Sequence, residues 1–91
     1  MTSTIKLPRM LEGSVRSGLS HGVVGTTVQE ALDHLFQSEP GLRGHLLDER
    51  GAIRPHVSIF VDGDQANLET PVGETAEIRV LHAVSGGRQR V

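Results

Sequence analysis

The sequence predicts an α+β domain in which a mixed sheet of four to five strands packs on one main helix. Three observations lead to this prediction. The chain has 91 residues, which suits one domain with a single modest core. One segment has its apolar residues at helical spacing, and several short segments alternate apolar with polar residues. Because one helical stripe covers one face of one sheet, the expected architecture has two layers.

The first two strands are expected to pair as an N-terminal hairpin. Residues 4–7 alternate polar and apolar side chains, and Pro8 ends that strand or lies at its edge. Glycines are frequent over residues 13–25, which favours a loop. The second half of this segment, around residues 19–24, is predicted to be the second strand.

Thr27 and Glu30 have the spacing of a capping box at the start of the helix. In such a box the Glu30 amide donates to the Thr27 hydroxyl, and the Thr27 amide donates to the Glu30 carboxylate. Apolar side chains then follow at positions i, i+3, i+4, i+7 and i+8, which is one stripe of a helix. The stripe consists of Val28, Ala31, Leu32, Leu35 and Phe36. Pro40 disfavours helical conformation at Glu39, so the helix should end near Ser38.

Three further strands are expected after a connector over residues 41–55. Leucines of the connector are predicted to form a short helical turn under the core. The best strand is 57–61, and the Asp-Gly pair at 62–63 signals a tight reversal after it. A weaker strand near 66–68 and a last strand over 77–81 complete the order β-β-α-β-β-β. A β-grasp roll has this order, with a right-handed helical crossover to a parallel strand and a central last strand.

The composition excludes several classes of function. A formal net charge of −2 lacks the strongly basic balance of a general nucleic-acid binder. Without cysteine, the chain has no disulfide, thiolate metal site or cysteine nucleophile, and its five histidines lack ligand spacing. No phosphate loop, nucleophile elbow or convincing acid and base pair supports an enzyme. With neither a membrane-spanning run nor a signal peptide in the sequence, we expect a cytoplasmic protein.

Gly86 and Gly87 are the strongest candidates for functional residues. Since glycine has no Cβ atom, the pair adopts almost any backbone conformation and fits a narrow active site. The pair alone is a weak signal in a chain with 11 glycines. A frayed terminus is therefore the alternative interpretation.

Three segments together resemble the ThiS/MoaD family of ubiquitin-like sulfur carriers. They are the C-terminal run 78–87, the strand and turn 54–63, and the helix with its flanks at 26–28 and 39–42. The resemblance extends from Ile5 to Gly87 and implies a single ubiquitin-like β-grasp domain over residues 1–87 with a flexible Gly-Gly tail. The long connector and the Arg-Pro-His sequence at 54–56 look most like the branch that includes CysO-type carriers of cysteine biosynthesis.

The resemblance also implies a chemistry for the carboxylate of Gly87. In this family a ubiquitin-activating-like adenylyltransferase adenylates the terminal glycine with ATP, and sulfur then replaces AMP to give a thiocarboxylate. The chain would be a carrier rather than an enzyme, and the partner would consume the ATP, so no cofactor would stay bound. The implied sulfur acceptor is a cysteine synthase-like enzyme, a thiazole synthase-like enzyme or the large subunit of molybdopterin synthase. A pathway to a sulfur-containing secondary metabolite is a further option.

Four residues follow Gly87, whereas the active form of the family ends at the second glycine. Gly87 has no free carboxylate to activate while it is in a peptide bond. We therefore expect cleavage between Gly87 and Arg88, which removes residues 88–91. A JAB/MPN-type metalloprotease, which the family sometimes employs, is the implied protease. The alternative is that these four residues are an artefact, such as a fusion scar.

Alternation along the two best strands separates core-facing from outward-facing side chains. The predicted core-facing residues are Val57, Ile59, Val61, Ile78 and Val80. Phe60 and Leu81 would then form an exposed apolar patch with Arg79 beside the tail, and such patches tend to mark partner sites. The resemblance implies that activating enzymes dock there. The predicted partner-binding residues are Phe60, Arg79, Leu81, Ala83, Val84 and Ser85. The alternative is that the loop 13–25 covers Phe60.

Two other functions fit the same fold. One is a protein modifier that forms isopeptide bonds through Gly87, and the other is a β-grasp adaptor that only binds partners. A thiocarboxylate would support the carrier, whereas adducts between Gly87 and lysine would support the modifier. The adaptor predicts that deletion of Gly86 and Gly87 has no effect.

Overall fold

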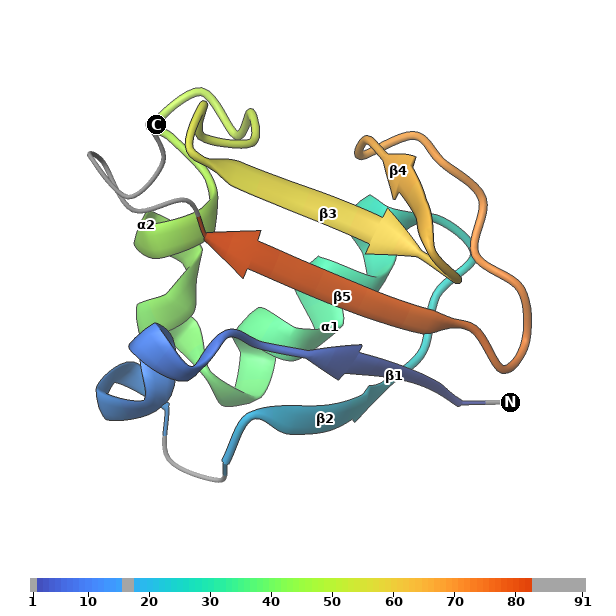
Figure 1. The fold of residues 1–91 in the computed structure, drawn as a ribbon, viewed down its shortest axis with the longest axis horizontal. Helices are drawn as coiled ribbons and strands as arrows, with labels where there is room; N and C mark the ends of the chain where they lie inside the picture. The colour runs from blue at the N-terminus through green and yellow to red at the C-terminus, as the bar shows by residue number, and fades with distance from the viewer. Residues whose placement is uncertain (1, 16–17, 83–91) are drawn as a thin grey trace, which may run out of the picture.

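Five strands form one mixed sheet, and the main helix α1 covers one of its faces (Figure 1). The structure is a computed structural model that describes residues 2–15 and 18–82. The strands are β1 (Ser3–Lys6), β2 (Ser20–Val23), β3 (Val57–Val61), β4 (Asp64–Ala66) and β5 (Glu77–His82). The helices are α1 (Val28–Ser38), α2 (Arg43–Leu46) and two 3₁₀ helices, Arg9–Ser14 and Pro40–Leu42. The predicted two-layer α+β fold is confirmed, and its architecture is a ubiquitin-like β-grasp.

The strand order is β2-β1-β5-β3-β4, so the last strand of the sequence lies at the centre of the sheet, as predicted. β1 and β2 pair antiparallel, with Ser3 opposite Val23. β5 runs parallel to β1 and antiparallel to β3. Strands from the two ends of the chain therefore lie side by side in the middle of the fold.

Of the five strands, only β3 has the predicted bounds. β1 begins and ends one residue before the predicted 4–7, and β5 extends one residue beyond the predicted 77–81. The two larger differences each have a local cause. The strand expected near 66–68 is β4, Asp64–Ala66, because the turn before it has only two central residues. Asp62 (φ 51°) and Gly63 (φ 92°) both have positive φ, as two-residue hairpin turns require, so Asp64 already pairs with Val61. The strand expected over 19–24 is β2, Ser20–Val23. The chain then passes so close to the start of α1 that a Cβ atom on Gly25 would lie 2.8 Å from the amide nitrogen of Ala31.

The helix α1 begins at Val28 with Thr27 as its N-cap, as predicted. The Glu30 amide donates to the Thr27 hydroxyl oxygen at 3.2 Å. The reciprocal bond predicted for the Thr27 amide was wrong by one residue. The Glu30 carboxylate instead accepts from the amide and the hydroxyl of Thr26, at 2.7 and 2.8 Å, while Thr27 forms an isolated β-bridge with Pro71. The helix ends at Ser38 with Glu39 as the C-cap, also as predicted.

The hydrophobic core lies between α1 and the sheet. All five residues of the predicted apolar stripe are buried, as are Ile5, Ile59, Ile78 and Val80 on the strands. Leu42 and Leu46 are fully buried as well, so the connector forms the short helical turn under the core that was expected. Residues 9–14 form a 3₁₀ helix that the sequence did not indicate, and Leu11 attaches it to the core at 3% exposure.

The helices in residues 2–15 and 18–82 are too short and too polar to cross a lipid bilayer. The longest of them, α1, has 11 residues, whereas a spanning helix needs about 20.

Candidate functional site

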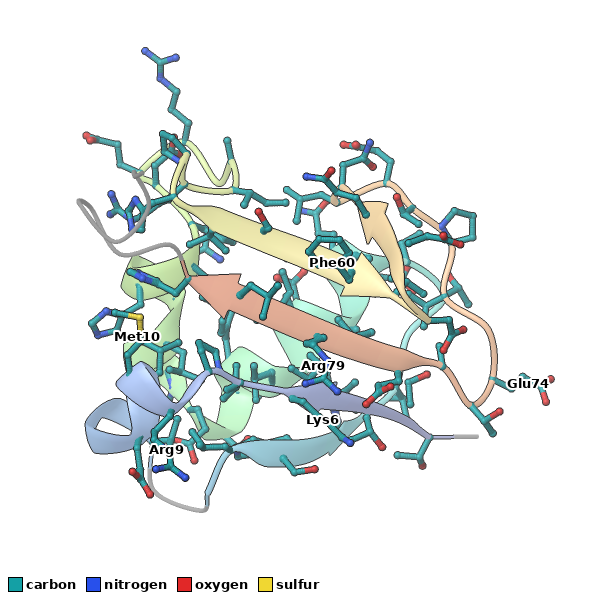
Figure 2. The ribbon with its side chains drawn as sticks, viewed as in Figure 1. Lys6, Arg9, Met10, Phe60, Glu74 and Arg79 are labelled. Atoms are coloured by element: carbon teal, nitrogen blue, oxygen red, sulfur yellow. The ribbon has the colours of Figure 1, made fainter. Side chains whose placement is uncertain are left out.

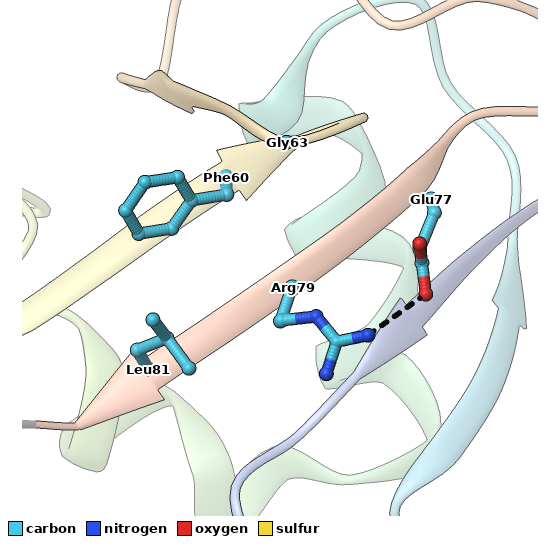
Figure 3. A pocket seen from close by; sticks show the side chains of 5 residues that line it. All are labelled: Phe60, Gly63, Glu77, Arg79 and Leu81. Atoms are coloured by element: carbon cyan, nitrogen blue, oxygen red, sulfur yellow. Dashed lines mark hydrogen bonds and ion pairs between the residues drawn. The ribbon is translucent and has the colours of Figure 1, made fainter.

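The face of the sheet opposite α1 carries three of the predicted partner-binding residues, Phe60, Arg79 and Leu81 (Figures 2 and 3). Phe60 on β3 lies opposite Arg79 on β5, and Ser58 lies opposite Leu81 in the same ladder. Their neighbours Ile59, Ile78 and Val80 are buried on the other face. The predicted alternation is confirmed, except that Val61 at the end of β3 is only partly buried.

Side chains from β3, β5 and the turn after β3 surround an open hollow of about 250 Å³ (Figure 3). Its lining residues are Phe60, Gly63, Glu77, Arg79 and Leu81. Leu81 is 44% exposed, which is high for a large apolar side chain. Among the described residues of the loop 13–25, none lines this hollow, and β2 is separated from β3 by β1 and β5. The described residues of this loop, 13–15 and 18–25, therefore take no part in the hollow beside Phe60.

A charged cluster borders the hollow on the side of β1. One carboxylate oxygen of Glu77 accepts from the Lys6 ammonium at 2.9 Å and from the Arg79 guanidinium at 3.1 Å. The Lys6 hydrogen bond and charge, with a smaller effect of Arg79, lower the pKa of Glu77 below its ordinary value. All three side chains are about half exposed. Because two cations share one carboxylate, the cluster has an excess of one positive charge.

Sequence reasoning missed Lys6, Gly63 and Glu77 as members of this surface. The alternation of side chains along β5 could have placed Glu77 on the same face as Arg79, because residues two apart on a strand share a face. The parallel register of β1 on β5, which sets Lys6 opposite Arg79, is not visible in the sequence. Gly63 reaches the hollow through the tight turn after β3.

The remaining predicted site residues lie outside the described residues. They are Ala83, Val84, Ser85, Gly86, Gly87 and Arg88. β5 ends at His82, so the strand that carries Arg79 and Leu81 is the one that leads to these positions in the chain.

A pair of histidines lies at the end of β5. The ring centroids of His56 and His82 are 4.5 Å apart, and the two rings meet edge to face at 71°. Burial lowers the pKa of His82 below its ordinary value, and the charges of His56 and His45 lower it further. In the part of the chain that the structure describes, no three His, Asp or Glu side chains are arranged to hold a metal ion.

Comparison with known structures identifies the same fold in proteins from several organisms. The chain superposes on SAMP1 of Haloferax volcanii with a TM-score of 0.85 and 24% identity, over 96% of this chain and 100% of that one. It superposes on the BexX/CysO complex of Amycolatopsis orientalis with a TM-score of 0.85 and 24% identity, over 93% and 99%. It superposes on CysO of Mycobacterium tuberculosis with a TM-score of 0.81 and 22% identity, over 90% of this chain and 99% of that one. At these identities the likeness shows the fold.

The family of the chain follows from its sequence. No curated protein sequence matches it significantly. The model of the ThiS family matches residues 20–87, well over half of the chain. The chain therefore belongs to the ThiS family.

Proposed function

We propose that this protein is a sulfur carrier whose reactive group is the carboxylate of Gly87. The observation that carries the proposal is the match to the ThiS family, which runs through Gly87 and leaves residues 88–91 outside. Removal of residues 88–91 by cleavage between Gly87 and Arg88 would free this carboxylate, and a JAB/MPN-type metalloprotease is the proposed protease. Because activation consumes ATP, the proposal assigns the protein to the cytoplasm.

The proposed chemistry takes place in the active sites of other enzymes. A carboxylate oxygen of Gly87 attacks the α-phosphorus of ATP, pyrophosphate leaves, and a Gly87 acyl-adenylate forms. A sulfide donor then attacks the carbonyl carbon, AMP leaves with the former carboxylate oxygen, and a thiocarboxylate remains. The carrier acts as a co-substrate of a ubiquitin-activating-like adenylyltransferase. It then gives up the sulfur to an acceptor enzyme that makes cysteine, molybdopterin, thiazole or a secondary metabolite.

The hollow on the open face of the sheet supports the docking of a protein partner. Its volume of about 250 Å³ lies below the range of roughly 300–1,000 Å³ that is usual for small-molecule sites. It combines the apolar side chains of Phe60 and Leu81 with a border of excess positive charge. We propose that the adenylyltransferase inserts an apolar side chain between Phe60 and Leu81 and offers a carboxylate to Arg79.

The proposed docking surface is also close to Gly87 in the sequence. Leu81 lies only six positions before Gly87, so a partner that holds this face of β5 has the tail close to its own active site. The proposal extends the docking surface to Ala83, Val84 and Ser85, between the sheet and the two glycines. Gly86 and Gly87 would enter the active site of the partner, because glycines fit a narrow channel.

The CysO-like branch is part of the proposal and has two supports. The chain has the fold of CysO from two organisms, and in Amycolatopsis orientalis CysO forms a complex with BexX. The chain is equally similar to SAMP1, a small archaeal modifier protein, at 24% and 22% identity. This likeness favours a second function, that of a protein modifier. A modifier would share the activation of Gly87 but pass its acyl group to a lysine amine of a target protein.

The deciding experiment is mass spectrometry of the chain truncated after Gly87. The protein is incubated with ATP, a ubiquitin-activating-like adenylyltransferase and a sulfide source. We expect a mass increase that corresponds to one sulfur in place of one oxygen. The full-length chain and a chain without Gly86 and Gly87 are the controls, and neither should change in mass.

Three results would count against the carrier. No mass change, with an enzyme that converts its own known carrier in the same buffer, would reject it. Adducts between Gly87 and lysines, without thiocarboxylate, would identify the modifier instead. A chain without Gly86 and Gly87 that retains its cellular function would identify the adaptor.

A further inference from the structure

His82 is the last described residue before the C-terminal tail, and the ring of His56 packs against it. The ring centroids are 4.5 Å apart at an interplanar angle of 71°. His82 pairs with Val57 in the β3–β5 ladder, and His56 directly precedes Val57. The ring contact therefore ties the last residue of β5 to the residue before β3. Edge-to-face contact between uncharged aromatic rings at this distance is favourable.

The surroundings of this pair keep His82 uncharged at neutral pH. His82 is partly buried, and its Nδ1 atom is buried without a hydrogen-bond partner among the described residues. The pKa of His82 is lowered from the ordinary value of 6.5 by burial, then by the charge of His56 and then by that of His45. His56 belongs to the turn before β3 and His45 to α2, so within residues 2–15 and 18–82 the charges that lower the pKa of His82 are those of two other imidazoles.

We propose that His56 is a positioning residue, whose ring fixes His82 and with it the point on β5 from which residues 83–87 continue. This inference rests on the proposed function, because it concerns the presentation of the tail that ends in Gly87. A fixed starting point limits the directions in which Gly87 can be offered to a partner bound at Phe60 and Leu81. His56 acts through His82 and does not itself touch the reacting carboxylate.

The contact between His56 and His82 should depend on pH. In the folded chain His82 takes up a proton less readily than in the unfolded chain, because its pKa is lowered. The stability that the folded chain gains from an uncharged His82 is complete well above pH 6.5. It is lost as the pH falls below 6.5 toward the lowered pKa of His82. A proton on His82 would also be repelled by the charge of His56, whose ring centroid lies 4.5 Å away.

A spin label on the tail measures this positioning in the isolated full chain. The sequence contains no cysteine, so Ser85→Cys provides a single site for a nitroxide. Paramagnetic broadening of amide signals is recorded at neutral pH and at a pH well below 6.5 in the parent chain, His56→Ala and His56→Phe. In the parent at neutral pH we expect strong broadening confined to amides that lie close together in the fold, which we call a compact set. In acid we expect weaker broadening spread over many amides, which we call a diffuse set. His56→Ala should give the diffuse set at both pH values.

The two further variants test whether ring contact and charge are responsible. His56→Phe keeps an aromatic ring without a titrating group, so the compact set should persist to lower pH than in the parent. His21→Ala is the matched control, because His21 on β2 bonds to the Gly18 carbonyl and β1 separates β2 from β5. It should behave as the parent does. Amide spectra of each variant report folding in the same experiment.

Three results would overturn the proposal. They are a diffuse set in the parent at neutral pH, a compact set that survives His56→Ala, and the same pH dependence in His56→Phe as in the parent. The measurement needs neither ATP nor an activating enzyme. Its failure is therefore distinct from a failure to form the thiocarboxylate.

Discussion

Phe60 on β3 and Arg79 on β5 lie directly opposite each other, on the face of the sheet that α1 leaves uncovered. This pairing brings an aromatic ring and a half-exposed guanidinium to the edge of one hollow (Figure 3). An apolar patch with a charged border is typical of a surface that meets another protein. The first two predictions concern this surface.

Leu81→Asp should impair activation by the proposed adenylyltransferase without unfolding the chain. The side chain is 44% exposed, so the substitution removes apolar contact with the partner and leaves the core intact. A central apolar contact of an interface contributes about 2 kcal/mol or more, which corresponds to a roughly 30-fold lower kcat/KM. Steady-state ATP–pyrophosphate exchange measures this change.

Val24→Asp is the matched control for Leu81→Asp. Val24 is exposed to a similar extent, 47%, but lies just after β2 and does not line the hollow. Its variant should be activated at the parental rate. Equal kinetics for both variants would contradict docking at Leu81.

Arg79→Glu should slow association with the partner and change its dependence on salt. The substitution turns an excess positive charge beside Lys6 and Glu77 into an excess negative charge, so a carboxylate on the partner is repelled. We expect an association rate about tenfold lower at low salt, with the difference shrinking as salt screens the charges. Stopped-flow measurements at several salt concentrations test this, with Arg50→Glu in the exposed turn after Asp48 as the control. A rate that falls equally in both variants would point to net charge alone.

Gly25→Ala should destabilise the fold, because Gly25 combines a φ of 153° with close contact to α1. A Cβ atom there would lie 2.8 Å from the Ala31 amide nitrogen and from the Glu30 Cβ atom. Overpacking of this kind costs about 1–3 kcal/mol of unfolding free energy, which urea titration measures. Gly44→Ala in α2 is the control, since a Cβ atom at Gly44 meets nothing within 4 Å and alanine favours helix. If Gly25→Ala were as stable as the parent, the prediction would be wrong, and the chain could move apart where Gly25 lies against Glu30 and Ala31.

Glu77→Gln should make the stability of the chain less sensitive to acid. The pKa of Glu77 is lowered from the ordinary value of 4.5, chiefly by Lys6, so the folded state binds this proton less readily than the unfolded state. The charged Glu77 therefore stabilises the fold above pH 4.5, and this stabilisation is lost as the pH falls through the lowered pKa of Glu77. Urea titrations at a series of pH values should show a smaller loss in Glu77→Gln than in the parent. The loss should not vanish, because hydrogen bonds also lower the pKa of Glu30 and Asp48.

The protein isolated from its native cells should end at Gly87. Only a chain without residues 88–91 has a free Gly87 carboxylate for ATP to activate. Intact-mass measurement distinguishes the two forms directly. A chain that stays full length and unmodified under conditions where the pathway is active would contradict processing.

The sequence was sufficient where the determining contacts are local. The apolar stripe of α1 and the alternation around Phe60 and Leu81 follow from spacings of a few residues, so the helix, the core side of the strands and the outward patch could be predicted. The Thr26 bonds to Glu30 were missed because the capping box has a close variant one residue earlier. Whether a carboxylate accepts from Thr26 or Thr27 depends on how the chain enters the helix.

The charged border of the hollow was beyond sequence reasoning for a different reason. Lys6 and Glu77 meet only because β1 and β5 are parallel neighbours in one register, and a shift of that register would separate them. The ring contact of His56 with His82 likewise depends on where β3 and β5 pair. Long-range strand pairing thus determines the parts of the surface that the spacing of residues leaves open.

The parallel pairing of β1 with β5 also affects how the protein folds. β5 is the last strand that the structure describes and lies at the centre of the sheet, so the core cannot close around Ile78 and Val80 until β5 has joined the strands that precede it in the chain. Phe60 and Arg79 take up their shared surface only in that closed state. Before β5 pairs, the proposed docking face is therefore absent, and the proposed activating enzyme would recognise only folded chains.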